Sequence, residues 1–248
     1  MANSAKAQSG PQPSVFDEAF LTGAEDVTEV LLIRHGQQRV NREGSRDEQR
    51  DPPLTDHGQQ QARLLGEALS TTNFDAIYAS PLKRAHETAK AVAAHHRLEL
   101  VVIDDLREVE IFRDIPEGAN VRELLSEELL RAVRRRMLDE LSWDVYPYSE
   151  SSYEFKKRTI NAVESCIARH SSGRIAIVCH GGVINAYAGH IVGSKYDFFF
   201  RPAHTSVQIV DAGHGRRSLR RLNDTQHLET AEGSFRHLLA RARAPERA

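Results

Sequence analysis

The stretch VLLIRHG, residues 30–36, is the strongest indication of how this chain folds. It closes a run of β-branched and leucine residues, Val27 to Ile33, which predicts a strand that ends directly before Arg-His-Gly. A second junction of the same kind follows, where the strand expected over Arg174 to Cys179 ends before His180. That run is apolar almost throughout, which is typical of a strand buried on both faces of a sheet. Two buried strands that each end in His-Gly therefore organise the expected fold.

Helical and strand patterns alternate along the rest of the chain. Thr55 is expected to cap one helix. Ser80 is expected to cap a second helix that starts at Pro81, which places Arg84 in the first turn of that helix. Strands separated by helices predict an α/β fold, with three α/β/α layers around a mostly parallel central sheet. The other expected elements are strands over Ala76–Ala79 and Leu98–Ile103, helices over Val121–Leu141 and Ser152–His170, and a hairpin over Thr205–Val210 and Ser218–Leu222.

The chain is expected to form one domain with an appendage at each end. Residues 1–26 are rich in Ala, Ser, Gln, Gly and Pro and bury little apolar surface, so they are expected to form a flexible arm. Residues 27–222 carry the patterns of the domain itself. Residues 223–248 are expected to form a C-terminal tail with one short helical pattern.

The composition argues against several classes of protein. The 33 Lys and Arg nearly balance the 35 Asp and Glu, giving a net charge of −2, so no overall attraction to nucleic acid is expected. Neither a signal segment nor a membrane-spanning run is visible, so no membrane partner is expected. Cys166 and Cys179 show no disulfide or zinc spacing, and the 12 histidines include no pair with metal-ligand spacing. The chain is therefore expected to be cytoplasmic, with no metal and no cofactor.

The residues at the two strand ends point to an anion. The carboxyl ends of parallel strands lie on one edge of a sheet, so His35 and His180 should meet there. Arg34, from the first junction, and Arg84, from the helix after Ser80, should project toward the same edge. Two guanidiniums beside two imidazoles, with glycines that allow close backbone approach, suit a tetrahedral phosphoryl group.

Five ordered segments of the sequence resemble a known family. They read VLLIRHGQQRVN, LTDHGQQQARLLGEAL, ASPLKRAHETA, LREVE and IVCHGGVI, and together they extend from Val30 to Ile184. In this order they resemble the histidine phosphatase, or phosphoglycerate mutase-like, superfamily, and more closely its phosphatase branch. The resemblance implies a phosphoglycerate mutase-like fold.

The resemblance also implies roles for particular residues. His35 would be the nucleophile that takes the phosphoryl group, with Arg34, Arg84 and His180 holding the phosphoryl oxygens. Glu108 would protonate the leaving group and later accept a proton from the attacking water. Planar guanidiniums stabilise charge on phosphoryl oxygens without requiring a metal.

Three further assignments are less direct. Asn41 aligns with the asparagine that follows Arg-His-Gly in the family and would donate a hydrogen bond to the phosphate, as Gln37 could also do. The acid-bearing loop departs from the family pattern, because this chain continues as EVEIFRDIPEGANV from Glu108. Glu110 is therefore a rival for the acid role, with Glu108 preferred from its position after Leu106.

The expected function is hydrolysis of a small phosphorylated substrate, with inorganic phosphate as a product, through a phosphohistidine and without a metal. A phosphoglycerate mutase is the alternative within the superfamily. Mutases share the catalytic residues, but in them a second phosphorylated hydroxyl, rather than water, resolves the phosphohistidine. A phospho-ligand binding module without useful turnover is the alternative from another class. The loops Glu43–Pro53 and Ile111–Asn120 carry no readable code for the substrate, and no pattern indicates the oligomeric state.

Overall fold

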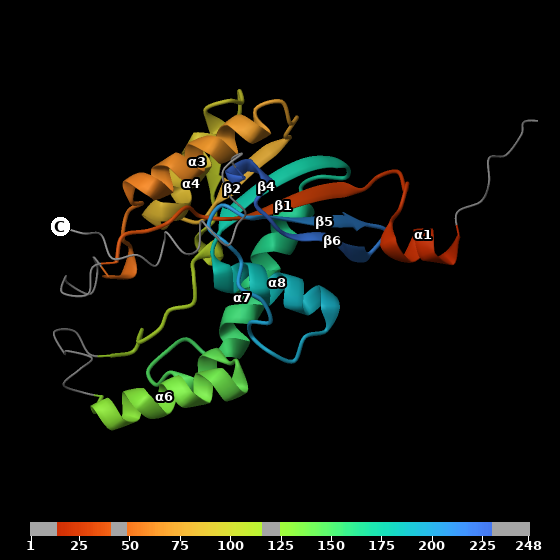
Figure 1. The fold of residues 1–248 in the computed structure, drawn as a ribbon. Coiled ribbons are helices and arrows are strands. Elements are labelled where there is room, and N and C mark those ends of the chain that lie inside the picture. Colours follow the sequence, from red (N-terminus) through yellow and green to blue (C-terminus); the bar gives the residue numbers. More distant parts are fainter. Residues whose placement is uncertain (1–13, 41–48, 116–124, 230–248) are drawn as a thin grey trace, which may run out of the picture.

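The computed structural model describes residues 14–40, 49–115 and 125–229. They form a six-stranded sheet with helices on both faces, drawn as a ribbon in Figure 1. Across the sheet the strand order is β3-β2-β4-β1-β5-β6. The strands are β1 (Thr28–Arg34), β2 (Ala76–Ala79), β3 (Leu100–Val102), β4 (Gly173–Cys179), β5 (Val207–Gly213) and β6 (Arg216–Asp224).

The topology brings the two strands expected to carry the site together at the centre of the sheet. β1 pairs in parallel with β4 and antiparallel with β5, while β2 and β3 extend the parallel side beyond β4. β5 and β6 form an antiparallel hairpin at the other edge. The expected mostly parallel sheet is therefore confirmed. The register of β1 and β4 places Arg34 opposite Cys179, so the two strands end side by side.

Alternate side chains of β1 enter two different cores. Val30 and Leu32 pack in the core that also contains side chains of α7 and α8, and Leu31 and Ile33 pack in the core that contains side chains of α3 and α4. This is the two-residue period of a strand with both faces covered, and it confirms the three-layer α/β/α arrangement. The helices are α3 (Asp56–Leu69), α4 (Lys83–Ala93), α6 (Glu127–Glu140), α7 (Ser152–Ile167) and α8 (Gly181–Val192).

The start of α4 differs from the sequence pattern. The helix begins at Lys83 and not at Ser80-Pro81. The Ser80 hydroxyl lies 2.8 Å from a ring nitrogen of His180, so a contact between the ends of two strands takes the place of the expected helix cap. The helix expected from Val121 is observed from Glu127, and its expected first residues lie outside the described ranges.

Both ends of the described chain are more ordered than expected. Helix α1 (Val15–Phe20) begins with a capping box between Ser14 and Asp17, and Leu21 directly after it is buried. The expected flexible arm is therefore ordered from residue 14, while residues 1–13 lie outside the described ranges. At the other end β6 continues to Asp224 and Leu228 is buried, so the expected tail boundary at residue 223 falls within the last strand.

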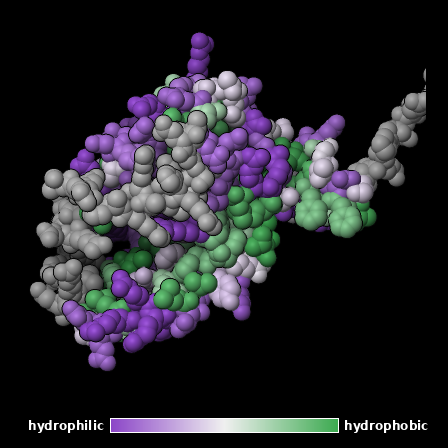
Figure 2. Space-filling model, viewed as in Figure 1, coloured by the Kyte–Doolittle hydropathy of each residue, from purple (hydrophilic) through white to green (hydrophobic). Residues whose placement is uncertain are grey.

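Helix α1 presents apolar side chains to solvent. Val15, Phe16 and Phe20 are exposed, and they form the green patch at the right of Figure 2. Within the residues that the structure describes, no helix combines the length and apolar character needed to cross a bilayer.

Candidate active site

The ends of β1 and β4 bring two histidines into contact. The His35 amide donates to the carbonyl of Cys179 at 3.0 Å, which continues the ladder between the strands by one residue. The ring centroids of His35 and His180 are 5.1 Å apart. Both side chains are buried, with relative exposures of 2% and 0%. The predicted meeting of these residues, 145 positions apart in sequence, is therefore observed.

The environment of His35 determines which ring nitrogen can react. Nδ1 lies 2.6 Å from the carbonyl oxygen of Gly36. Because a carbonyl oxygen only accepts, Nδ1 must carry the proton, and in the neutral ring Nε2 keeps its lone pair. Burial holds the pKa of His35 well below its usual value, and the neighbouring His180, Arg34 and Arg84 lower that pKa further. His35 is therefore neutral at neutral pH, with Nε2 available as a nucleophile.

Two arginines, the half-buried Arg34 and the buried Arg84, lie beside the histidines. Arg34 donates through Nη1 to the carbonyl of Pro202 at 2.6 Å, and Arg84 donates through Nη1 to the carbonyl of Arg50 at 3.2 Å. Burial lowers the pKa of Arg34 to about 10, which leaves the side chain charged at neutral pH. The buried Nε atoms of Arg34 and Arg84 have no hydrogen-bond partner among the described residues. Buried donors of this kind are suited to an anion.

His180 also has a free ring nitrogen. Its Nε2 lies 2.8 Å from the hydroxyl of Ser80, which in turn accepts from the backbone amide of Leu82 at 3.3 Å. Its Nδ1 is buried and has no partner within the described part of the chain. Burial, Arg84 and Arg34 hold the pKa of His180 well below its usual value. We call His35, His180, Arg34 and Arg84 the basic cluster.

Glu108 lies next to the basic cluster and is held by backbone amides. Its Oε1 accepts from the amide of Val109 at 3.0 Å, and its Oε2 accepts from the amide of Gly182, in the first turn of α8, at 3.1 Å. A Cβ atom at position 182 would lie 2.2 Å from Oε1, so any other residue there would displace the Glu108 carboxylate from this position. Burial lowers the pKa of both Arg34 and Arg84, and the charge of Glu108 opposes part of that lowering, which places the carboxylate within electrostatic reach of the cluster.

The rival acid, Glu110, occupies a different environment. Its carboxylate forms an ion pair with Arg50 and lies 3.8 Å from Nε of Arg107. These pairs engage it outside the basic cluster, whereas Glu108 faces the cluster. The geometry therefore favours Glu108 for the acid–base role.

The structure does not bring Gln37 into the basic cluster. Its side-chain oxygen accepts from the hydroxyl of Thr55 at 3.0 Å, next to the start of α3. Asn41, the other expected amide donor, lies outside the described residues, as does much of the loop expected over Glu43–Pro53.

Sequence reasoning missed a third histidine. The ring of His204 is 5.8 Å from that of His35, and burial lowers the pKa of His204 to about 3, helped by Arg34 and Arg201. His204 directly precedes the strand expected from Thr205, but no family segment marks this residue. The available signal was topological, because an antiparallel strand beside β1 must begin at the edge where β1 ends, and Thr205 donates there to the His35 carbonyl at 3.3 Å.

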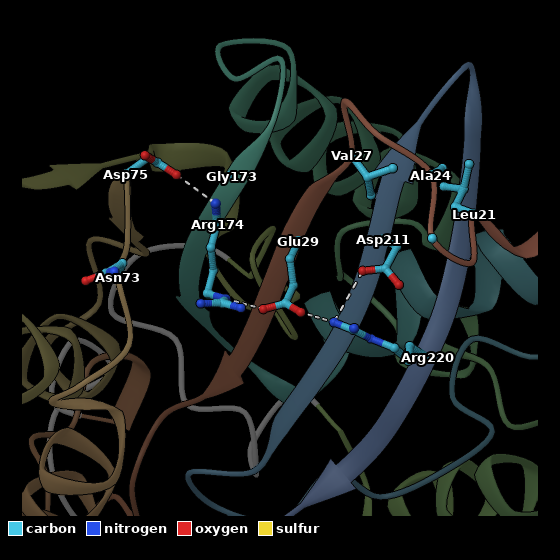
Figure 3. A pocket seen from close by; sticks show the side chains of 11 residues that line it. Leu21, Ala24, Val27, Glu29, Asn73, Asp75, Gly173, Arg174, Asp211 and Arg220 are labelled. Carbon is cyan, nitrogen blue, oxygen red and sulfur yellow. Dashed lines mark hydrogen bonds and ion pairs between the residues drawn. The ribbon is translucent and has the colours of Figure 1, made fainter. Parts of the chain in front are cut away.

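A cavity lies at the opposite end of the central strands from the basic cluster. It measures about 560 Å³ and lies at the amino ends of β1 and β4 (Figure 3). Its charged side chains pair with one another, since Glu29 bridges Arg174 and Arg220, and Arg220 also contacts Asp211 at 3.3 Å. The charges of this cavity are neutralised internally, in contrast to the unpartnered donors of the basic cluster.

A second cavity, of about 580 Å³, is lined by chain neighbours of Arg84 and Glu108 and by two residues of the segment before α3. The lining residues are Arg50, Asp51, Leu82, Lys83, Arg107 and Glu110. The lining of this cavity is therefore mostly charged.

The fold and the site together define an enzyme that handles phosphoryl groups. Residues 30–225 match the model of the Histidine phosphatase superfamily (branch 1), and the chain belongs to this superfamily. The match confirms the family resemblance and the class of enzyme predicted from the sequence, a phosphatase of the histidine phosphatase type.

Some of the similar proteins are named as phosphatases and others as phosphoglycerate mutases. The chain is 28% identical to Phosphoserine phosphatase 1 of Hydrogenobacter thermophilus, over 82% of this chain and 95% of the relative. It is 31% identical to the Probable phosphoglycerate mutase GpmB of Photorhabdus laumondii, over 75% of this chain and 86% of the relative. Among solved structures, the alpha-ribazole phosphatase of Shigella flexneri is 26% identical with a TM-score of 0.63, over 79% of this chain and 96% of that one.

Proposed function

We propose that the chain is a phosphomonoester hydrolase that works through a phosphohistidine at His35 and requires no metal. The observation that carries the proposal is the 2.6 Å contact between Nδ1 of His35 and the Gly36 carbonyl. It leaves the Nε2 lone pair free next to two guanidiniums that can bind a phosphoryl group. A buried neutral imidazole in a cationic surrounding suits nucleophilic attack on phosphorus.

In the first half-reaction the phosphoryl group moves to His35. The guanidiniums of Arg34 and Arg84, together with Nδ1 of His180, bind the phosphoryl oxygens and offset their charge as the transition state forms. A bond forms between Nε2 of His35 and phosphorus while the bond from phosphorus to the ester oxygen breaks. Glu108 in its carboxylic acid form transfers its proton to that oxygen, so the product leaves as an alcohol.

In the second half-reaction water takes the phosphoryl group. The carboxylate of Glu108 accepts a proton as the water oxygen attacks phosphorus, and the bond to Nε2 of His35 breaks. Inorganic phosphate leaves, His35 regains its lone pair and Glu108 is again protonated. Glu108 therefore donates a proton in the first half-reaction and accepts one in the second.

The charge of the basic cluster is the reason for proposing a reaction without a metal. Arg34 is half-buried and Arg84 is buried, and the Nε of each is a buried donor without a partner among the described residues. Guanidiniums in a water-poor site supply much of the charge stabilisation that a divalent ion supplies in other phosphatases.

The proposal is tested with the purified protein and p-nitrophenyl phosphate in the presence of EDTA. We expect phosphate release by the wild-type protein and none by His35→Ala, with the exposed His190→Ala as the matched control that retains activity. Rapid quenching with substrate labelled in its phosphoryl group should trap an acid-labile label on the wild-type protein only. Unchanged turnover by His35→Ala, or complete dependence on added metal, would refute the mechanism.

A phosphoglycerate mutase is the second candidate, because a relative with that name is 31% identical to this chain. Conversion of 3-phosphoglycerate to its isomer, stimulated by a bisphosphate primer, would favour it over hydrolysis. A label that stays on His35 without release would instead favour the phospho-ligand binding module.

The proposed substrate is a small phosphorylated metabolite, and the relative named phosphoserine phosphatase makes phosphoserine a suitable first compound to test. Cys166 and Cys179 are both free and buried, which supports the expected reducing, cytoplasmic location.

A further inference from the structure

Arg158, on the second turn of α7, donates every N–H of its guanidinium to Glu150 or to the loop that carries Glu108. Nε and one Nη2 hydrogen bind the two carboxylate oxygens of Glu150, at 2.6 and 2.8 Å. The remaining three donors bind backbone carbonyls of the loop that carries the proposed acid. These contacts are Nη1 to Asp105 at 2.8 Å, Nη1 to Arg107 at 2.8 Å and Nη2 to Glu108 at 3.1 Å. Arginine has five N–H donors, so the guanidinium is fully satisfied.

The partner of Arg158 holds the other end of the same loop. A carboxylate oxygen of Glu150 accepts from the amide of Glu110 at 3.3 Å, and the amide of Glu150 donates to the carbonyl of Glu110 at 3.1 Å. The ion pair is largely removed from solvent, with side-chain exposures of 15% for Arg158 and 4% for Glu150. Residues 105–110 are therefore held by one buried pair along their whole length.

Without the Arg158–Glu150 ion pair, the apolar contacts of the loop alone would leave its position adjustable. Leu106 and Val109 are buried in the core under α7 and α8, which anchors the loop to the domain. They do not set the direction of the peptide units between them, because apolar packing is not directional. Two of the carbonyls bound by Arg158, those of Arg107 and Glu108, belong to those peptide units, and the Glu108 carboxylate accepts from the amide of Gly182.

We propose that Arg158, braced by Glu150, is a positioning residue that holds Glu108 at the distance and angle needed for proton transfer. Arg158 does not touch the phosphoryl group in this proposal, which rests on the function proposed above. A carboxyl group transfers a proton only within hydrogen-bond reach of the reacting oxygen. A small displacement of the loop should therefore slow proton transfer from Glu108 before it affects phosphate binding.

The leaving group provides a readout that a merely structural role would not move. An alkyl alcohol must be protonated as it leaves, whereas p-nitrophenol is acidic enough to leave as its anion. The value of kcat/KM reports the steps up to departure of the leaving group, so it is independent of the later attack by water. Loss of acid positioning should therefore lower kcat/KM for an alkyl phosphate much more than for p-nitrophenyl phosphate.

The experiment compares Arg158→Lys and Glu150→Gln with wild type on glycerol 1-phosphate and p-nitrophenyl phosphate. Lysine keeps the charge but has at most three donors from one atom, so it cannot hold Glu150 and three carbonyls together. We expect kcat/KM for the alkyl phosphate to fall by about 100-fold and that for the aryl phosphate by less than about 3-fold, in line with the usual contribution of general acid catalysis. Glu150→Gln should show the same selectivity at smaller amplitude.

The control is Arg217→Lys, which alters another arginine–glutamate pair, between β6 and α7. Arg217 also binds both oxygens of a glutamate, Glu164, but it contacts no residue of the acid loop. Its ratio of alkyl to aryl kcat/KM should equal that of wild type. An equal loss on both substrates in Arg158→Lys, or no loss on either, would overturn the positioning role. If Arg158→Lys does not fold, the same criteria apply to Glu150→Gln. Failure of wild type to hydrolyse either ester would refute the proposed function instead.

Discussion

His227 should make the stability of the domain sensitive to mild acid. Its ring is mostly buried, with Nε2 2.9 Å from the Thr205 hydroxyl, and burial lowers the pKa of His227 to about 4 even though Asp224 acts in the opposite direction. In the unfolded chain the same ring has a pKa of about 6.5. The unfolded state therefore binds a proton first as the pH falls, and protonation favours unfolding.

The size of the effect follows from the two pKa values of His227. The contribution is fully present above about pH 6.5 and is lost as the pH falls toward about 4, at about 1.4 kcal/mol per pH unit within that window. Between pH 8 and pH 5 this amounts to about 2 kcal/mol for a fully buried ring. Some solvent reaches His227, so we expect a loss of about 1–2 kcal/mol.

The assay is urea unfolding of wild type and His227→Gln at pH 8, 7, 6 and 5. Glutamine can still donate to Thr205 but does not titrate. From pH 8 to pH 5 the free energy of unfolding should therefore decrease by about 1–2 kcal/mol less in the variant than in wild type. His190→Gln, at an exposed position near the end of α8, serves as the control with the same change in composition. Parallel curves for wild type and His227→Gln would refute the assignment of acid sensitivity to this ring.

Three other predictions concern the site. Gly36→Ala should lower the free energy of unfolding by about 1–3 kcal/mol in urea titrations, because the new Cβ would lie 2.5 Å from the Gly58 carbonyl oxygen. Glu108→Gln should reduce kcat/KM for an alkyl phosphate by about 100-fold and Glu110→Gln by less than about 3-fold; the reverse order would assign the acid role to Glu110. Burial keeps the pKa of His35 low, so the acid limb of kcat/KM for p-nitrophenyl phosphate should lie below about pH 6.5, and a limb above that value would contradict a neutral buried nucleophile.

The centre of the fold and the basic cluster were predictable because their signals are local. Strands β1 and β4 each contain an uninterrupted apolar run, Val30–Ile33 and Ile175–Cys179, which indicates burial on both faces without reference to other parts of the chain. Each strand is followed at once by histidine and glycine, so predicting where the strands end also predicted where His35 and His180 lie. Arg84 could be placed because the residues before it begin a helix, even though the observed start is a few residues later.

Other features depend on contacts that leave no local pattern. Ser80 has the residue type of a helix cap, yet its hydroxyl contacts His180, and only the neighbouring strands β2 and β4 reveal this. Gln37 follows the catalytic motif but turns toward Thr55 at the start of α3. In the sequence Arg158 resembles an ordinary surface arginine of an amphipathic helix, because its five hydrogen bonds go to Glu150 and to three residues of a loop some fifty residues earlier.

The central position of β1 also has a consequence for synthesis of the protein. β1 is the first strand to leave the ribosome, but both of its neighbours, β4 and β5, belong to the last third of the chain. An apolar strand must therefore wait for its partners through most of translation, exposed to aggregation or to capture by chaperones. Catalytic competence can arise only after nearly the whole domain has been made, so activity of a nascent or truncated chain would report completion of the sheet.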